Sequence, residues 1–243
     1  MYMIHFDLST NDLLLLPEIR NLSLWYNRAM KKIISFDLDG TLVSARYGDM
    51  VWNHGIPVEY SKMHNMPFDE ARALIRRQYE SVGDCNLLWY EIDYWLERFS
   101  IPVSSKELLR RYESYIEPVS YAAEVLERLS KKYTIVIASN AARCFVEKEL
   151  DHTGFRHYFT HVVSATTDYG MIKKEQEFYR RICAYMQAQP SEVVHVGDHP
   201  VFDHDIPSSL GIESYYLADT GDGGTDLDGR RVIRSLKDLP EKL

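Results

Sequence analysis

Short apolar runs alternate with amphipathic segments along most of the chain. The first run, Ile33-Ile34-Ser35-Phe36, precedes a glycine turn and predicts a buried strand. Similar runs predict further strands at 134–138, 162–165, 193–196 and 214–217, with a short edge strand at 232–233. Apolar residues follow helical spacing in three intervening segments, 122–129, 145–150 and 178–186. Because strands alternate with helices, the pattern predicts an α/β fold with a parallel sheet and crossover helices.

A long insertion with helical periodicity interrupts this alternation between the first and second strands. Its apolar spacing predicts helices at 67–82, 88–99 and 104–112, the last with Ser104 and Glu107 in a capping-box pattern. The insertion holds three of the four tryptophans. We expect its aromatic residues mainly to form the core of a small helical bundle, with a few facing a cleft.

These patterns predict three parts of the chain. They are an N-terminal extension (1–30), a sheet domain (31–44 and 118–243) and the helical insertion (45–117). Residues 1–29 do not resemble the rest of the chain, and Met30 directly precedes the first clear strand. We therefore treat 1–29 as an appendage or as the product of a mis-assigned start.

Composition narrows the function classes. The 243 residues are 45% hydrophobic and 26% charged, which is ordinary for a globular protein. A net charge of −8 argues against broad binding to nucleic acid or anionic membranes, which favour a positive surface. The three cysteines lack disulfide or zinc spacing, and no apolar run is long enough to span a bilayer. These features lead us to expect a cytoplasmic location.

Two carboxylates follow the first predicted strand, in Asp37-Leu38-Asp39-Gly40-Thr41. Side chains two residues apart in an extended segment point the same way, so Asp37 and Asp39 form a plausible nucleophile and acid/base pair. Gly40 permits a sharp turn whose backbone amides can face an anion. A hard divalent cation can offset the second negative charge and leave one carboxylate nucleophilic. Taken alone, the motif is also compatible with a capping turn.

Polar groups also follow the later strands. Ser139-Asn140 ends the second, Lys173 follows the third, and Asp198 ends the fourth, with Asp203 five residues beyond it. Each has an ordinary explanation as a cap, a turn or a solvated charge. Their occurrence at successive strand ends predicts one site, because ligands of open α/β sheets bind beyond the carboxyl ends of the strands. Three histidines near Asp198, namely His195, His199 and His204, leave a transition-metal site as an alternative.

With these motifs, residues 31–240 resemble the haloacid dehalogenase (HAD) superfamily of phosphohydrolases. The resemblance implies a Rossmann-like catalytic core with a helical cap of type C1 inserted after the first strand. It implies that Asp37 is the nucleophile and forms an aspartyl-phosphate. It also implies that Asp39 protonates the leaving alcohol and then activates water. The presence of Asp39 favours a phosphatase over a dehalogenase, whose leaving halide needs no proton.

The same resemblance implies the remaining roles. Ser139 and Asn140 would contact the phosphoryl group, and Lys173 would neutralise its charge. Asp198 would hold Mg²⁺ with Asp37 and the backbone carbonyl of Asp39, and Asp203 would support that site. Gly40 and Thr41 would belong to the phosphate-binding turn. Lys174 stands where the family often has proline, so the motif lysine is assigned to Lys173.

The predicted function is therefore Mg²⁺-dependent hydrolysis of a small phosphorylated metabolite. Two alternatives are a phosphotransferase or mutase of the same superfamily and a phosphate-binding regulatory protein without turnover. We expect no nucleic-acid or membrane partner, and a monomer or homodimer. The insertion would decide specificity, with these candidate polar contacts: Arg46, Tyr47, His54, Lys62, Arg72 and Arg76.

Overall fold

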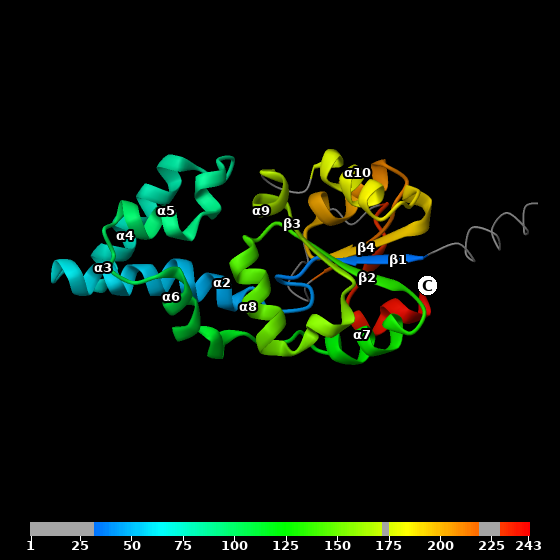
Figure 1. Cartoon of the computed structure of the whole chain (residues 1–243), viewed down its shortest axis with the longest axis horizontal. Coiled ribbons are helices and arrows are strands. Elements are labelled where there is room, and N and C mark those ends of the chain that lie inside the picture. Colours follow the sequence, from blue (N-terminus) through cyan, green and yellow to red (C-terminus); the bar gives the residue numbers. More distant parts are fainter. Residues whose placement is uncertain (1–31, 172–174, 219–228) are drawn as a thin grey trace, which may run out of the picture.

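A six-stranded parallel sheet forms the centre of the molecule, in a computed structural model that describes residues 32–171, 175–218 and 229–243 (Figure 1). The strands are β1 (Ile33–Phe36), β2 (Thr134–Ser139), β3 (His161–Ser164), β4 (Val193–Gly197), β5 (Glu213–Leu217) and β6 (Val232–Ile233). Their order is β3-β2-β1-β4-β5-β6, and the order reverses between β1 and β4. This is a Rossmann-like arrangement, and it confirms the predicted fold class. The N-terminal extension lies outside the described residues.

Apolar side chains alternate between the two faces of the sheet. Ile135 and Ile137 of β2 join one hydrophobic cluster, and Val136 and Ala138 join the other. Such two-sided burial explains why the strands are almost continuously apolar in sequence. The helices of this domain are α7 (Ala122–Ser130), α8 (Arg143–Thr153), α9 (Ala165–Tyr169), α10 (Gln176–Tyr185) and α11 (Ile206–Ser209). Figure 1 shows α7 and α8 on one side of the sheet and α10 on the other.

A helical segment lies between β1 and β2, beyond the carboxyl ends of the strands (Figure 1). Its α-helices are α2 (Arg46–Met50), α3 (Ile56–His64), α4 (Phe68–Val82), α5 (Ile92–Arg98) and α6 (Ser105–Arg111). A π-helical turn, η2 (Val51–Gly55), joins α2 to α3, and a 3₁₀ turn, η3 (Leu87–Tyr90), precedes α5. Trp95, fully buried, packs against Tyr79 and Phe99 in the interior of this segment.

Some sequence predictions are wrong in detail. The predicted helix at 88–99 is a 3₁₀ turn followed by α5, because Asn86 caps the turn and Glu91 is extended. Leu88, predicted on the buried face, is therefore exposed. The continuous helical run from α2 through α3 was not predicted. The third strand ends one residue earlier than predicted, since Ser164 caps α9 by accepting the backbone N–H of Thr167.

Short 3₁₀ and π turns complete the described structure: η4 (Glu113–Tyr115), η5 (Phe155–Tyr158), η6 (Pro190–Glu192), η7 (Pro200–Asp205) and η8 (Leu236–Glu241). Within the described ranges, the helices are too short or too polar to cross a bilayer.

Candidate active site

A tight turn follows β1 and presents its two carboxylates. The backbone N–H of Asp37 donates to the carbonyl of Val196 at 2.9 Å, which ties the start of the turn to β4. The carbonyl of Leu38 then accepts the N–H groups of Thr41, Leu42 and Val43 at 2.9–3.2 Å. The resulting turn leaves the Asp37 side chain 6% exposed, whereas Asp39 is more open.

Gly40 allows this turn to pass close to β4. Its φ of 78° lies in the left-handed region, and a Cβ at this position would overlap the carboxylate of Asp198. Thr41, fully buried, donates its hydroxyl to Asp37 Oδ2 at 3.5 Å. Of the two residues predicted for a phosphate-binding turn, Gly40 thus leaves room for the Asp198 carboxylate, and Thr41 donates a hydrogen bond to Asp37.

Three carboxylates meet where β1 and β4 end. One oxygen each from Asp37, Asp198 and Asp203 lies within 4.8 Å of the others. Asp37 and Asp203 are buried, and Asp198 is exposed. Clustered negative charges disfavour one another unless a cation offsets them. A set of hard oxygen donors fits Mg²⁺, which binds through carboxylates and keeps several waters.

A buried hydrogen-bond network orients Asp203. Its Oδ1 lies 3.1 Å from His195 Nε2, and its Oδ2 accepts the backbone N–H of His199 at 3.0 Å. Ser35 Oγ lies 2.8 Å from His195 Nδ1, so both ring nitrogens face polar partners. The hydroxyl of Tyr179 lies 3.1 Å from Nε2. Burial, then the charges of Asp203 and Asp37, raise the pKa of Tyr179 well above its usual value, so Tyr179 keeps its proton.

The histidines near Asp198 serve the fold in this structure. His195 belongs to the network around Asp203, and His199 Nδ1 accepts the N–H groups of Val201 and Phe202. His204 Nε2 accepts the N–H of Arg231. These contacts do not favour the alternative of a transition-metal site.

The loop after β2 lies next to the turn after β1. Phe36, the last residue of β1, pairs with Ile137, so Ser139 at the end of β2 and Asn140 after it lie level with the turn after β1. Ser139 is buried, and its Oγ accepts the backbone N–H of Ala141 at 3.0 Å. Asn140 Nδ2 lies 3.5 Å from the hydroxyl of Tyr90 in the inserted segment. Lys173 and Lys174 lie outside the described residues.

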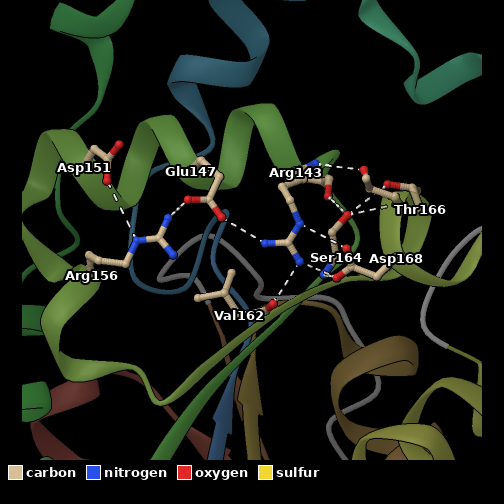
Figure 2. Close-up of polar contacts among 10 residues, drawn as sticks. Arg143, Glu147, Asp151, Arg156, Val162, Ser164, Thr166 and Asp168 are labelled. Carbon is tan, nitrogen blue, oxygen red and sulfur yellow. Dashed lines mark hydrogen bonds and ion pairs between the residues drawn. The ribbon is translucent and has the colours of Figure 1, made fainter.

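Arg143 holds the start of α8 against β3 and α9 (Figure 2). Its Nε donates to Asp168 at 3.0 Å, its Nη1 to Glu147 at 2.9 Å, and its Nη2 to the carbonyl of Val162 at 2.9 Å. Ser164 Oγ adds a bond of 2.7 Å to the carbonyl of Ala141. These contacts fix the loop between β2 and α8, which directly follows Ser139, the last residue of β2.

Glu149 is a site residue that the sequence analysis missed. It lies on α8 with no exposed surface, and neither carboxyl oxygen has a hydrogen-bond partner of good geometry among the described residues. Burial, followed by the neighbouring charges of Asp39 and Asp37, raises its pKa well above the usual value. The neutral form of Glu149 is therefore favoured beside Asp39. The available signal was its place on the apolar stripe of α8, between Val146 and Leu150.

A cavity of about 280 Å³ opens between Asp39 and the inserted segment. It is lined by Asp39, Gly48, Trp52, Asn53, Tyr79, Trp89, Tyr90, Ala141, Ala142 and Phe145. The rings of Trp52 and Phe145 stack with centroids 5.5 Å apart and planes at 19°, which joins the inserted segment to α8. The lining of the cavity thus includes the carboxyl group of Asp39 and several aromatic rings.

The polar contacts predicted for the insertion do not line this cavity. Arg46, Lys62, Arg72 and Arg76 pair instead with Glu117, Glu59, Asp69 and Glu80. Tyr47 is buried and donates its hydroxyl to the carbonyl of Leu109 at 3.1 Å, and the exposed ring of His54 packs against Phe68. Helical spacing alone did not reveal which face of each helix turns toward the sheet.

The sequence of the chain is similar to a known protein family. A family model of haloacid dehalogenase-like hydrolases matches residues 31–204. A search of curated proteins finds no significant match.

Solved structures resemble the whole fold. A HAD phosphatase from Thermococcus onnurineus superposes with a TM-score of 0.75 and 24% identity, over 87% of this chain and 97% of that one. A predicted phosphoglycolate phosphatase from Haemophilus somnus 129PT gives 0.59 and 18%, over 88% and 98%. The 2-haloacid dehalogenase from Pseudomonas syringae pv. tomato DC3000 gives 0.61 and 20%, over 87% and 97%. The fold is therefore shared by phosphatases and dehalogenases.

Proposed function

The chain belongs to the haloacid dehalogenase-like hydrolase family, and from this membership and its acid pair we propose that it is a Mg²⁺-dependent phosphatase of small phosphate monoesters. The observation that carries the proposal is the position of Asp39, which follows Asp37 by two residues and also lines the cavity. A leaving group held in that cavity would present its oxygen to a carboxyl able to protonate it. A halide leaving group would need no such acid.

In this proposal the Asp37 carboxylate attacks phosphorus and forms an aspartyl-phosphate, while Asp39 gives a proton to the departing oxygen. Asp39 then accepts a proton from the water that hydrolyses the acyl phosphate. Thr41 supports this role of Asp37 by donating a hydrogen bond to it. General acid–base catalysis of this kind contributes about 10²–10⁴-fold to the rate.

The cluster of Asp37, Asp198 and Asp203 would hold Mg²⁺, consistent with its three converging oxygens. The bound ion would supply positive charge against the phosphoryl oxygens, whose stabilisation dominates phosphoryl transfer. His195 and the N–H of His199 keep the Asp203 carboxylate turned toward the cluster. Ser139 lies at the end of the adjacent strand, where its hydroxyl would meet a phosphoryl oxygen. We assign to Lys173 the neutralisation of the phosphoryl charge.

The proposal is tested by assaying the purified chain on a panel of phosphate monoesters, with Mg²⁺ and with EDTA. Phosphate release that depends on Mg²⁺ is expected, and Asp37→Asn should abolish it. Asp39→Asn should slow turnover by at least about 100-fold. Halide release from 2-chloropropionate serves as the competing reaction. If no ester is hydrolysed, or if halide is released instead, the phosphatase assignment is wrong.

A further inference from the structure

The wall of the cavity beside Asp39 is aromatic. Trp52 and Phe145 stack on one another, and Tyr79 meets both Trp52 and Trp89 edge-on, with centroids 6.0 and 5.9 Å apart. These rings come from η2, α4 and η3 of the inserted segment and from α8 of the sheet domain. Interlocked rings lose little freedom when a ligand binds, and their faces favour a planar apolar partner.

The charge of the residues that line the cavity also favours an uncharged ligand. Asp39 is the only charged residue among the described residues that line it. The arginines and the lysine predicted for this segment are paired elsewhere. A carboxylate or a second phosphate on the leaving group would enter without a described basic partner and would face Asp39. Burying an unpaired anion is strongly unfavourable.

The volume of the cavity further limits the ligand that it can hold. Sites for drug-sized ligands occupy about 300–1,000 Å³. At about 280 Å³ the cavity is just below this range. Asn53 and Tyr90 add polar groups to its lining. A small ring with one neutral polar substituent matches these features better than a long or highly charged chain.

We propose that the leaving group of the substrate is a small, neutral alcohol that carries a planar apolar ring, bound between Asp39 and the Trp52–Phe145 stack. The proposal rests on the phosphatase function above and names its substrate class. It excludes phosphorylated carboxylic acids and bisphosphates as preferred substrates. Trp52 and Trp89 are then specificity-determining residues, and they touch the leaving group rather than the phosphoryl group.

The test compares benzyl phosphate, ethyl phosphate and 2-phosphoglycolate, whose leaving groups are all primary alcohols. With Mg²⁺, kcat/KM for benzyl phosphate should exceed that of each of the others by at least tenfold. Equal values for the three esters, or a preference for 2-phosphoglycolate, would overturn the leaving-group proposal and leave the phosphatase assignment standing. No hydrolysis of any ester would overturn both.

Variants locate the preference in the cavity. Trp89→Leu should lower kcat/KM for benzyl phosphate about tenfold and lower that for ethyl phosphate less, and an unchanged far-UV circular dichroism spectrum shows that the fold is intact. Asn53→Arg should raise activity on 2-phosphoglycolate relative to benzyl phosphate. Tyr185→Leu is the matched control, because this ring is 59% exposed on α10 and does not line the cavity. A ring preference that survives in Trp89→Leu and in Trp52→Leu would contradict the assignment.

Discussion

The buried carboxyl of Glu149 faces the carboxylate of Asp39 across the interface between α8 and the turn after β1. Two acids in contact without a described cation cannot both be ionised at low cost, and Glu149 is the one that is fully buried. The raised pKa of Glu149 favours its neutral form, which avoids repulsion between the two carboxyl groups. Glu149 lies beside the acid/base residue of the proposed reaction.

This relationship makes the stability of the protein depend on pH. The pKa of Glu149 is raised in the folded state, so between its unfolded and folded pKa values the folded protein binds more protons than the unfolded chain. Stability from this group is present below about pH 4.5 and is lost as pH rises toward the folded pKa, by about 1.4 kcal/mol per pH unit.

Glu149→Gln should remove this dependence. In EDTA, urea denaturation at pH 5 and pH 8 should find the variant progressively more stable than the parent as pH rises. Glu147→Gln, on the same helix but partly exposed, is the control and should leave the pH profile unchanged in shape. A parallel pH dependence in the parent and Glu149→Gln would show that Glu149 is ionised in the folded protein.

Gly40→Ala should weaken Mg²⁺ binding. The added methyl group would displace the Asp198 carboxylate, and the left-handed backbone would add about 1–2 kcal/mol of strain. Gly154→Ala is a matched control, because Gly154 has a φ of 70° with open space around its Cβ position. Calorimetric titration with Mg²⁺ should find at least tenfold weaker binding in Gly40→Ala only. Equal affinities would mean that Asp198 is not a ligand.

Asp203→Ala should lower the free energy of unfolding by about 1–3 kcal/mol, because His195 Nε2 and the N–H of His199 lose their acceptor inside the protein. Asp151→Ala, whose side chain is 71% exposed, should change it by less than about 0.5 kcal/mol. Urea denaturation in EDTA separates this effect from metal binding. A similar small change in both variants would argue against the buried network.

Arg143→Met should loosen the start of α8. The variant loses hydrogen bonds to Asp168, Glu147 and the carbonyl of Val162, the last of which is left without this donor (Figure 2). Hydrogen exchange of the amides at 143–147 should accelerate more than the corresponding change at α10 in Arg181→Met. Arg181 is more exposed and pairs with Glu177 one turn away, an interaction worth about 0.3–0.5 kcal/mol.

Local sequence was sufficient for the fold class. Strands buried on both faces are apolar throughout, so β1, β2 and β4 could be located within a residue or two. Because the predicted strands are parallel, the residues that follow them were expected at one edge of the sheet. The structure does bring Asp37, Asp198 and Asp203 together there. The catalytic roles of these residues remain predictions.

Tertiary structure decided what surrounds the acid pair. Helical spacing identified buried faces in the insertion, but it could not say which aromatic rings turn toward Asp39, because that depends on how the inserted helices pack against α8. Trp52 became part of the cavity wall through its stack on Phe145, which lies far away in the chain and in another part of the fold. In the sequence, Glu149 looks like an ordinary polar residue of an amphipathic helix. Only the packing of α8 against the rest of the domain buries it.

The sequence by itself thus determined the order of the elements and the acids at the strand ends. Only packing between distant segments decided the shape, charge and pKa environment of the site, because desolvation and ring contacts depend on neighbours in space.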